Sequence, residues 1–354
     1  MSRSSYENLL FPVVRHLDPE TAHERTITAL SLAQRTSAGR LILRRIAGSV
    51  PAHAVRVGNL TFPNVLGVAA GFDKDARAVE GLASLGFGHI EVGTLTPRAQ
   101  AGNPRPRVFR LPADQALINR MGFPNNGVDA AVSRLRGLTS QKRRYVLGVS
   151  LGKQKETPLE EAVNDYLLVM KAAHPYADYL AVNISSPNTP GLRELQGGQQ
   201  LDNLLSVLVN ENVRLAEKTG VRPPPLWVKI APDLSWVELD EILATVASVG
   251  IEGIIATNTT TTRDGLIDSK QVEAGGLSGR PLRERSTEII NYIHRQSGGS
   301  IPIIGVGGVA SVDDIREKLD AGAAVVQLYT GLIYGGPGLP GRLMRELEDF
   351  TSKI

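Results

Sequence analysis

The stretch DYLAVNISSPNTPG, residues 178–191, has the pattern of a buried strand that ends in a polar loop. Ser186 follows the apolar run and lies between Asn183 and Asn188, with no histidine in the stretch to activate it. Seven other runs of strand length close on Gly, Asn, Thr or Ser and precede stretches with helical spacing. The eight runs are residues 64–71, 88–94, 145–151, 178–185, 226–231, 253–259, 301–308 and 324–330.

Continuous apolar strands that alternate with helices are typical of a parallel sheet covered on both faces. Eight such units predict an α/β fold, a (β/α)8 TIM barrel, with an open doubly wound sheet as the alternative. Two insertions are also predicted. Residues 55–62 resemble a hairpin that closes the barrel floor, and the connection 95–144 can supply another pair of strands over the top.

The first fifty residues predict a helical extension, so we expect residues 1–50 to form a separate segment and residues 51–354 to form the barrel. Asp18-Pro19-Glu20 predicts the start of a helix that extends to about Arg35, because it supplies a cap, a proline and an early acid. Before it, an apolar stripe at helical spacing is formed by Leu10, Val13, Val14 and Leu17.

Charge and composition narrow the possible functions. Residues 1–50 hold seven arginines against four acidic residues, and therefore all of the net charge of +3. This excess indicates either an ordinary solvated face or attraction to an anionic membrane surface. A nucleic-acid groove is disfavoured, because the segment has one pair of aromatic residues and no lysine.

The chain has no cysteine, which excludes disulfides, thiolate metal sites and a cysteine nucleophile or base. No apolar run reaches the ~20 residues of a membrane-spanning helix. The N-terminus lacks the pattern of a secretory signal, so we expect a cytoplasmic protein.

Residues just after each run are the candidates for a site, because a barrel builds its site at the C-terminal ends of its strands. They are mostly neutral amides and hydroxyls with two lysines, which disfavours a divalent metal site and a Ser-His-Asp triad. The set is Ala70, Gly71, Phe72, Asp73, Lys74, Thr94, Ser150, Asn183, Ser185, Ser186, Asn188, Lys229, Thr257, Asn258, Thr259, Gly305, Gly307, Gly308, Tyr329 and Thr330, with Asn119 from the long loop.

Amides and hydroxyls in a barrel mouth suit a planar heterocycle with carbonyl and N–H edges. Glycine-rich turns at residues 305–308 and 329–331 follow the last two runs, where barrels commonly bind phosphate. Flavin mononucleotide (FMN) has both a planar ring and a phosphate. Taken singly, such a turn is more often only a tight turn, and the alternative for a single strand-end lysine is an exposed cation without a binding role. The prediction therefore depends on their conjunction.

Ten motifs occur in order between about residues 55 and 340. They are AAGFDKDA, EVGTLTPRAQ, PRVFRL, INRMGF, NISSPNTPGLR, VKIAPDL, ATNTT, GGLSGRPL, GVGGV and YTG. With these motifs and its Arg-rich extension, the chain resembles the dihydroorotate dehydrogenase family, in its membrane-associated, quinone-linked class 2. The resemblance implies an FMN-dependent oxidoreductase of pyrimidine biosynthesis that converts (S)-dihydroorotate to orotate. It also implies electron transfer to a membrane quinone, with the extension forming an apolar funnel.

The resemblance assigns roles to individual residues. Ser186 is similar to the serine base of this class, which takes the C5 proton; a serine is a weak base and must pass its proton onward in a dry site. The residues implied to bind substrate are Lys74, Asn119, Arg120, Met121, Gly122, Phe123, Asn183, Asn188, Asn258 and Thr259. Those implied to bind FMN are Ala70, Gly71, Phe72, Asp73, Lys74, Thr94, Ser150, Asn183, Lys229, Thr257, Gly279, Gly308, Tyr329 and Thr330.

At the quinone funnel, the implied polar residues are His23 and Arg110; the alternative for His23 is an ordinary imidazole on a helix surface. The chain departs from the family pattern where Ser150 replaces the usual Asn of GxNxGK, and we expect a weaker or water-mediated flavin contact there. Pro124 after RMGF, and Thr330 in place of Ser, are milder departures.

Three other functions stay open at this stage. One is the same oxidation linked to fumarate or NAD, and another is a lyase that uses Lys74 or Lys229 as a Schiff-base nucleophile. The third is a membrane-surface binding protein without chemistry. For the leading hypothesis we expect a monomer at the cytoplasmic face of the cell membrane. Its partners would be dihydroorotate, orotate, a quinone and anionic lipid, with no metal and no nucleic acid.

Overall fold

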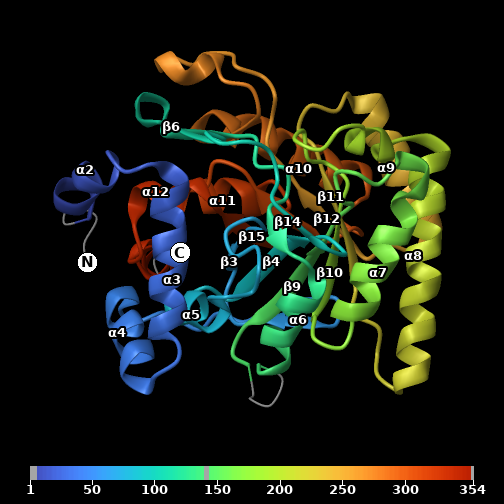
Figure 1. Ribbon diagram of the computed structural model, residues 1–354, viewed down its shortest axis with the longest axis horizontal. Coiled ribbons are helices and arrows are strands. Elements are labelled where there is room, and N and C mark those ends of the chain that lie inside the picture. The colour runs from blue at the N-terminus through green and yellow to red at the C-terminus, as the bar shows by residue number, and fades with distance from the viewer. Residues whose placement is uncertain (1–5, 139–142, 352–354) are drawn as a thin grey trace.

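Eight parallel strands close into a barrel at the centre of the computed structural model, which describes residues 6–138 and 143–351 (Figure 1). Each strand pairs with its neighbours in chain order, and the last pairs with the first. The strands are β3 (Leu66–Val68), β4 (His89–Leu95), β9 (Val146–Leu151), β10 (Tyr179–Asn183), β11 (Leu226–Ile230), β12 (Gly253–Ala256), β14 (Ile303–Val306) and β15 (Val325–Leu328). The predicted (β/α)8 TIM barrel is confirmed, and the doubly wound alternative is wrong.

Helices follow the barrel strands and cover the outside of the barrel. On the right in Figure 1, α7, α8 and α9 form one side of this layer. Helix α8 shows why they pack there, because Leu201, Leu204, Leu205 and Leu208 recur at helical spacing and are all buried. The helices are α5 (Val79–Ser84), α6 (Val128–Arg136), α7 (Ala162–Ala173), α8 (Gly198–Thr219), α9 (Trp236–Val249), α10 (Arg283–Gln296), α11 (Val312–Asp320), α12 (Thr330–Gly335) and α13 (Leu339–Thr351).

A hairpin of β1 (Val55–Val57) and β2 (Leu60–Phe62) lies next to the barrel floor, as predicted. Its Phe62 is fully buried in a cluster with Tyr179 and Trp227. These large rings fit because glycines face them: a Cβ on Gly148 would lie 2.1 Å from the Tyr179 ring, and one on Gly253 would lie 2.6 Å from the Trp227 ring. The floor is therefore closed by aromatic packing.

Three antiparallel strands form a roof over the other end of the barrel, with β7 (Ala116–Asn119) between β6 (Val108–Leu111) and β13 (Gly276–Gly279). The predicted extra pair of strands is confirmed, whereas β13 was not predicted. A small core of its own supports the roof and includes Leu111, Ile118 and Leu277. A short antiparallel pair, β5 (Ala99–Gln100) and β8 (Asn125–Asn126), lies in the same long connection.

The N-terminal extension is helical, and Figure 1 shows it on the left of the barrel. The helix predicted from Asp18 is confirmed, because the Asp18 carboxylate accepts from the Thr21 N–H at 2.8 Å and caps α3. The apolar stripe does not lie on one helix, since the preceding helix ends at Val14. The elements are the π-helical turn η1 (Tyr6–Leu10), α2 (Phe11–Val14), α3 (Pro19–Ala33) and α4 (Ser37–Ala47). Among the described residues, no helix is both long and apolar enough to cross a membrane.

A buried ion pair anchors the extension to the loop before β6. Glu20 is buried in the first turn of α3, and its Oε1 lies 2.6 Å from Arg107 Nη2 and 3.0 Å from Arg105 Nη2. Arg107 also donates to the carbonyls of Ala101 and Asn103, at 2.6 and 2.7 Å. The orientation of α3 relative to the barrel mouth is thereby fixed.

Candidate active site

A cleft with an open volume of about 1430 Å³ lies at the C-terminal ends of the barrel strands. Most of the residues singled out in the sequence line it, although they come from loops far apart in the chain. The predicted site residues in its lining are Ala70, Gly71, Lys74, Thr94, Asn119, Met121, Gly122, Phe123, Asn183, Ser186, Asn188, Lys229, Thr257, Asn258, Thr259, Gly279, Gly307, Gly308, Tyr329 and Thr330.

The asparagines of the cleft hold one another in fixed orientations. Asn183, at the end of β10, donates from Nδ2 to Thr94 Oγ1 at 2.8 Å and accepts at Oδ1 from Asn258 Nδ2 at 3.3 Å. Across the mouth, Asn188 Nδ2 donates to Asn119 Oδ1 in the roof, at 3.2 Å. Amides fixed in this way present donors and acceptors to a ligand without a large ordering cost.

Ser186 lies in the loop directly after β10 and is 5% exposed. Its Oγ accepts from the backbone N–H of Asn188 at 3.2 Å. This contact orients the hydroxyl from within its own loop, as in the turns that serine commonly forms. The hydroxyl therefore lines the cleft in a nearly dry setting.

Two lysines of the cleft lie in different environments. Lys74 Nζ donates to the Gly71 carbonyl at 2.8 Å, and burial lowers the pKa of this ammonium group below its ordinary value, while Glu24 and Glu20 partly oppose that shift. Lys229 projects from β11 and forms an ion pair with Glu91, which is itself fully buried. The cleft thus contains two lysines: Lys74 is held by a neutral carbonyl, and Lys229 is paired with a carboxylate.

Glycine-rich turns form one end of the cleft. Gly308 has φ of +75°, and a Cβ there would lie 2.4 Å from Arg283 Cβ. Gly279 has φ of +100°, and a Cβ there would lie 2.4 Å from the Gln115 carbonyl oxygen. Nearby, the hydroxyls of Ser278 and Thr330 are 2.8 Å apart. Open backbone next to hydroxyls is the donor set that binds phosphate oxygens.

Four of the residues that the resemblance implies to bind substrate or FMN lie outside the lining of this cleft. Asp73 is buried and accepts the N–H groups of Arg77 and Ala78 at 2.8 and 2.7 Å, just before α5. Ser150 lies behind Thr94, with 2.9 Å between the two hydroxyl oxygens. It is fully buried, so its effect on a ligand would pass through Thr94.

The other two are Arg120 and Phe72, which have different neighbours. Arg120 points to the outside of the roof, where its Nη1 is 2.7 Å from Glu273 Oε2. Phe72 packs between two aromatic rings, with centroid distances of 5.2 Å to His23 and 5.5 Å to Tyr329. Phe72 therefore belongs to the wall between the cleft and the N-terminal extension.

A second cavity, with an open volume of about 1240 Å³, lies behind this wall and is lined largely by apolar residues from the extension, the roof and the region of α12. Both His23 and Arg110 line it. Burial, with smaller contributions from Lys74 and Arg77, lowers the pKa of His23 to about 3, so the ring is neutral at physiological pH. Four residues line both cavities and therefore separate them by one layer of side chains: Asn119, Met121, Ser278 and Tyr329.

Several lining residues were not singled out in the sequence. Gln327 projects from the middle of β15 into the cleft, and its Oε1 has no hydrogen-bond partner among the described residues. Arg280, Arg342 and Ser278 line the glycine-rich end. A polar residue inside an apolar run, as in AVVQLYT, is the signal that would have identified Gln327.

Comparisons with known proteins agree on one family. The sequence model of the family described as dihydroorotate dehydrogenase matches residues 53–351. Among curated proteins, the chain is 49% identical over 343 residues to one from Burkholderia thailandensis, covering 96% of this chain and 97% of the relative. It is 50% identical over 348 residues to one from Chromobacterium violaceum, covering 97% and 98%. Both relatives are named dihydroorotate dehydrogenase (quinone).

Solved structures give the same result. The ligand-free dihydroorotate dehydrogenase of Eimeria tenella matches with a TM-score of 0.85 at 36% identity, covering 95% of this chain and 96% of the other. Its complex with ferulenol also matches with a TM-score of 0.85, at 35% identity, covering 95% and 92%. The similarity therefore extends over both the barrel and most of the N-terminal extension.

Proposed function

The chain belongs to the dihydroorotate dehydrogenase family, and from this premise we propose that it oxidises (S)-dihydroorotate to orotate and passes the electrons to a membrane quinone. It is an oxidoreductase of pyrimidine biosynthesis. The observation that carries the finer proposal is the pair of adjoining cavities. One is a polar cleft that contains Ser186, and the other is an apolar cavity behind Phe72 and Tyr329.

Ser186 is proposed as the base of the reaction. Its Oγ takes the proton from C5 of dihydroorotate and releases its own proton to solvent, while the hydrogen on C6 leaves with two electrons, so that the C5=C6 double bond forms. The N–H contact from Asn188 supports this role by holding the hydroxyl in place. A serine needs such positioning, because its ordinary pKa makes it a poor base.

The amides around Ser186 suit the substrate ring. Asn119, Asn183, Asn188 and Asn258 present both donors and acceptors, which a ring with carbonyl and N–H edges requires. The Lys74 ammonium, held at the cleft wall by the Gly71 carbonyl, would neutralise the substrate carboxylate. Binding of an anion there favours the charged form of the lysine, which burial alone disfavours.

FMN is the proposed cofactor, and the residues present fit it. Lys229, Thr94 and Thr257 line the inner part of the cleft and would hold the ring, with the unpartnered Gln327 Oε1 as an acceptor. Gly279, Gly308 and Thr330 would hold the phosphate at the glycine-rich end. When bound, FMN supplies a two-electron acceptor for the substrate and a donor for the quinone.

The second cavity is the proposed quinone site. His23 and Arg110 are the lining residues proposed to contact the quinone, and Arg110 is held by the Leu17 carbonyl at 2.7 Å from Nη1. A neutral imidazole can donate to a quinone oxygen, and a guanidinium can stabilise the charge that develops there. Because Tyr329 lines both cavities, the quinone would lie close to the cofactor without entering the substrate cleft.

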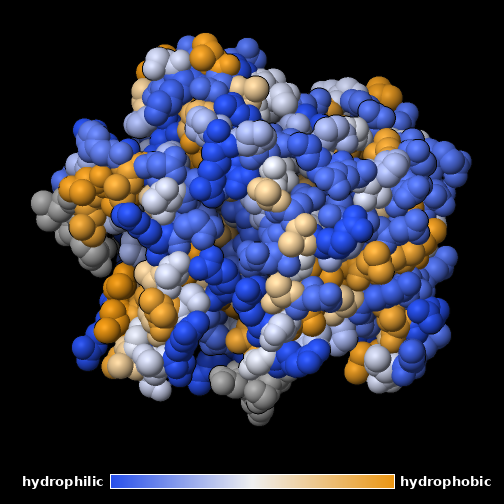
Figure 2. Space-filling model, in the orientation of Figure 1, coloured by the Kyte–Doolittle hydropathy of each residue, from blue (hydrophilic) through white to orange (hydrophobic). Residues whose placement is uncertain are grey.

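We also propose peripheral contact with the cytoplasmic face of the membrane. Leu41 and Ile42 of α4 are 48% and 57% exposed, and Val13 of α2 is 67% exposed. Figure 2 shows orange, hydrophobic surface beside blue, hydrophilic surface on the left, where Figure 1 places α2 and α4. Arg44 and Arg45 lie in the last turn of α4 and add cationic charge. An amphipathic surface of this kind binds in the plane of the bilayer.

Anaerobic absorption spectroscopy tests the proposal. The purified protein should show a flavin band that bleaches on addition of dihydroorotate and returns on addition of a soluble quinone analogue. If the flavin band returned with fumarate or NAD but not with the quinone analogue, the proposed electron acceptor would be wrong. A flavin band that dihydroorotate does not bleach would contradict the substrate.

A further inference from the structure

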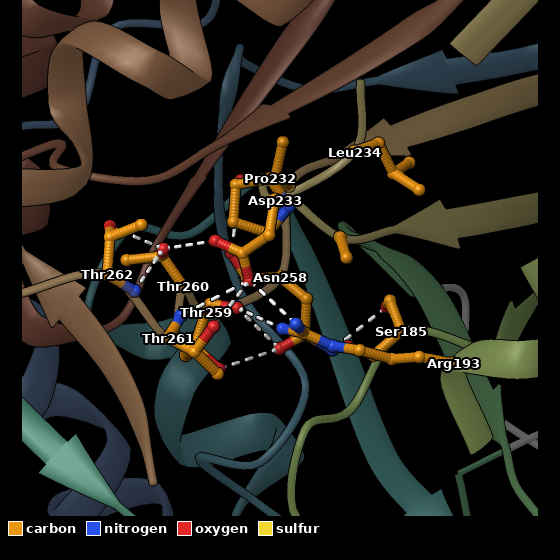
Figure 3. Close-up of polar contacts among 12 residues, drawn as sticks. Ser185, Arg193, Pro232, Asp233, Leu234, Asn258, Thr259, Thr260, Thr261 and Thr262 are labelled. Carbon is orange, nitrogen blue, oxygen red and sulfur yellow. Dashed lines mark hydrogen bonds and ion pairs between the residues drawn. The ribbon is translucent and has the colours of Figure 1, made fainter. Parts of the chain in front are cut away.

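Arg193 joins three of the loops that surround the cleft (Figure 3). It lies in the 3₁₀ turn η4 (Leu192–Gln196), and its Nε donates to the Ser185 carbonyl at 3.2 Å. Its Nη2 donates to the Thr259 carbonyl at 3.0 Å, and its Nη1 is 2.7 Å from Asp233 Oδ2. These partners follow β10, β12 and β11, so one planar guanidinium connects three consecutive strand ends.

Asp233 extends this connection along the loop after β12. Its Oδ1 accepts from the Thr260 hydroxyl, and its Oδ2 accepts from the Thr261 N–H at 3.2 Å. The carboxylate therefore binds the guanidinium and the neighbouring loop at the same time. Arg193 and Asp233 are 25% and 19% exposed, so water screens the pair only in part.

We infer that Arg193 is a positioning residue for the proton transfer, an inference that rests on the proposed function. Arg193 holds the carbonyls of Ser185 and Thr259. Ser186 is the residue after the first, and Asn258 is the residue before the second. A direct contact supports the coupling, because Asn258 Nδ2 donates to Ser185 Oγ at 3.0 Å. Arg193 thus sets the position of the proposed base relative to the amide that would hold the substrate. Proton transfer is sensitive to such placement, since a shift of ~1 Å costs roughly 100-fold.

The test is the Arg193→Ala holoenzyme, with its two half-reactions measured separately by anaerobic stopped flow. We expect flavin bleaching by dihydroorotate to slow by about 100-fold. Reoxidation by a soluble quinone analogue should keep the wild-type rate, because Arg193 does not line the second cavity. Added guanidinium ion should restore part of the bleaching rate, because it can occupy the place of the missing side-chain group. A general structural defect would not be repaired in this way. Wild-type bleaching in Arg193→Ala would overturn the inference.

Arg285→Ala is the matched control. Arg285 also holds the loop after β11, with donors 3.1 Å from the Pro232 carbonyl and 2.7 Å from the Leu234 carbonyl. In the described structure it has no hydrogen bond to Ser185 or Thr259. The flavin of Arg285→Ala should be bleached by dihydroorotate at the wild-type rate. Equal slowing in both variants would contradict a specific role for Arg193.

A second variant, Asp233→Asn, tests the same inference if Arg193→Ala folds poorly. This substitution keeps the side-chain volume but removes the charge that pairs with Arg193. Bleaching should therefore slow by less than in Arg193→Ala, again without an effect on reoxidation. Equal slowing of both half-reactions would overturn the inference. Failure of the proposed function has a different signature, because the wild-type flavin would then not be bleached by dihydroorotate.

Discussion

Lys229 Nζ lies 3.3 Å from Glu91 Oε1 inside the barrel, at the inner end of the cleft. The other carboxylate oxygen of Glu91 accepts from Tyr179 Oη at 3.0 Å and from Gln327 Nε2 at 2.9 Å. Glu91 is fully buried, and Lys229 is 4% exposed. A buried charge pair of this kind fixes the position of the cation and also offsets its field.

Glu91→Gln should therefore destabilise the protein and make the bound flavin easier to reduce. Removing one partner of a buried ion pair costs roughly 3 kcal/mol in the free energy of unfolding. The unopposed Lys229 cation should favour the electron-rich form of the cofactor, which raises the midpoint potential. Spectroelectrochemistry and denaturant unfolding measure the two effects.

Tyr179→Phe is the control for charge, because it removes a hydrogen bond to Glu91 and leaves the carboxylate. It should reduce stability by ~1 kcal/mol with little change in the midpoint potential. An equal shift of potential in both variants would mean that packing, rather than charge, sets the effect.

Ser186→Ala should slow flavin bleaching by dihydroorotate by roughly 100-fold or more, because the proposed general base is lost. Flavin content should stay normal, since Ser186 lies beside the amides rather than at the glycine-rich end. Stopped-flow absorption measures the rate, and orotate titration of the flavin spectrum measures ligand affinity. A large loss of orotate affinity, with an unchanged rate at saturation, would show that Ser186 binds the ring rather than removing a proton.

The barrel could be predicted from the sequence because its strands are mostly apolar runs of strand length, and their polar ends meet at one edge. Strand β13 could not, since GLSG is poor in strand-forming residues and its partner β7 lies more than 150 residues earlier. Ser278 therefore enters the cleft through a pairing that local sequence does not encode. The single helix expected through Leu17 was also wrong, because the chain turns after Val14 and before the Asp18 cap.

The sequence predicts which site residues lie at strand ends, but it does not predict the direction in which each side chain points. Arg120 and Phe123 come from the same motif, yet Arg120 points to the outside of the roof and Phe123 lines the cleft. Glu91 and Gln327 were missed because they lie within runs that were interpreted as apolar core. Their mutual contact is a consequence of barrel closure, which brings β4 and β15 to the two sides of β3.

His89 should make stability sensitive to acid. It is fully buried without a partner for either ring nitrogen among the described residues, and burial lowers its pKa to about 3. The unfolded state then binds a proton that the folded state does not, so stability falls as the pH drops from about 6.5 towards 3. His89→Leu should remove up to ~1.4 kcal/mol per pH unit of this slope. Urea unfolding across this range measures it, with the exposed His53→Ala as the control. Equal slopes in all three proteins would contradict the prediction.

Membrane contact should depend on the exposed apolar residues of α4. Replacing Leu41 and Ile42 by Glu adds charge to a surface that would enter the headgroup region, so binding to vesicles of anionic lipid should weaken at least tenfold. Sedimentation with vesicles of graded anionic content measures this loss.

Ile267→Glu provides the matched control, because this side chain is 75% exposed and lies in the loop before η5 (Ser269–Val272), away from α4. It should leave vesicle binding unchanged, and the double variant of α4 should still bleach with dihydroorotate, since neither Leu41 nor Ile42 lines the cleft. Undiminished vesicle binding by the α4 variant would show that another surface meets the membrane. An equal loss in Ile267→Glu would show that binding follows net charge alone, without a specific face.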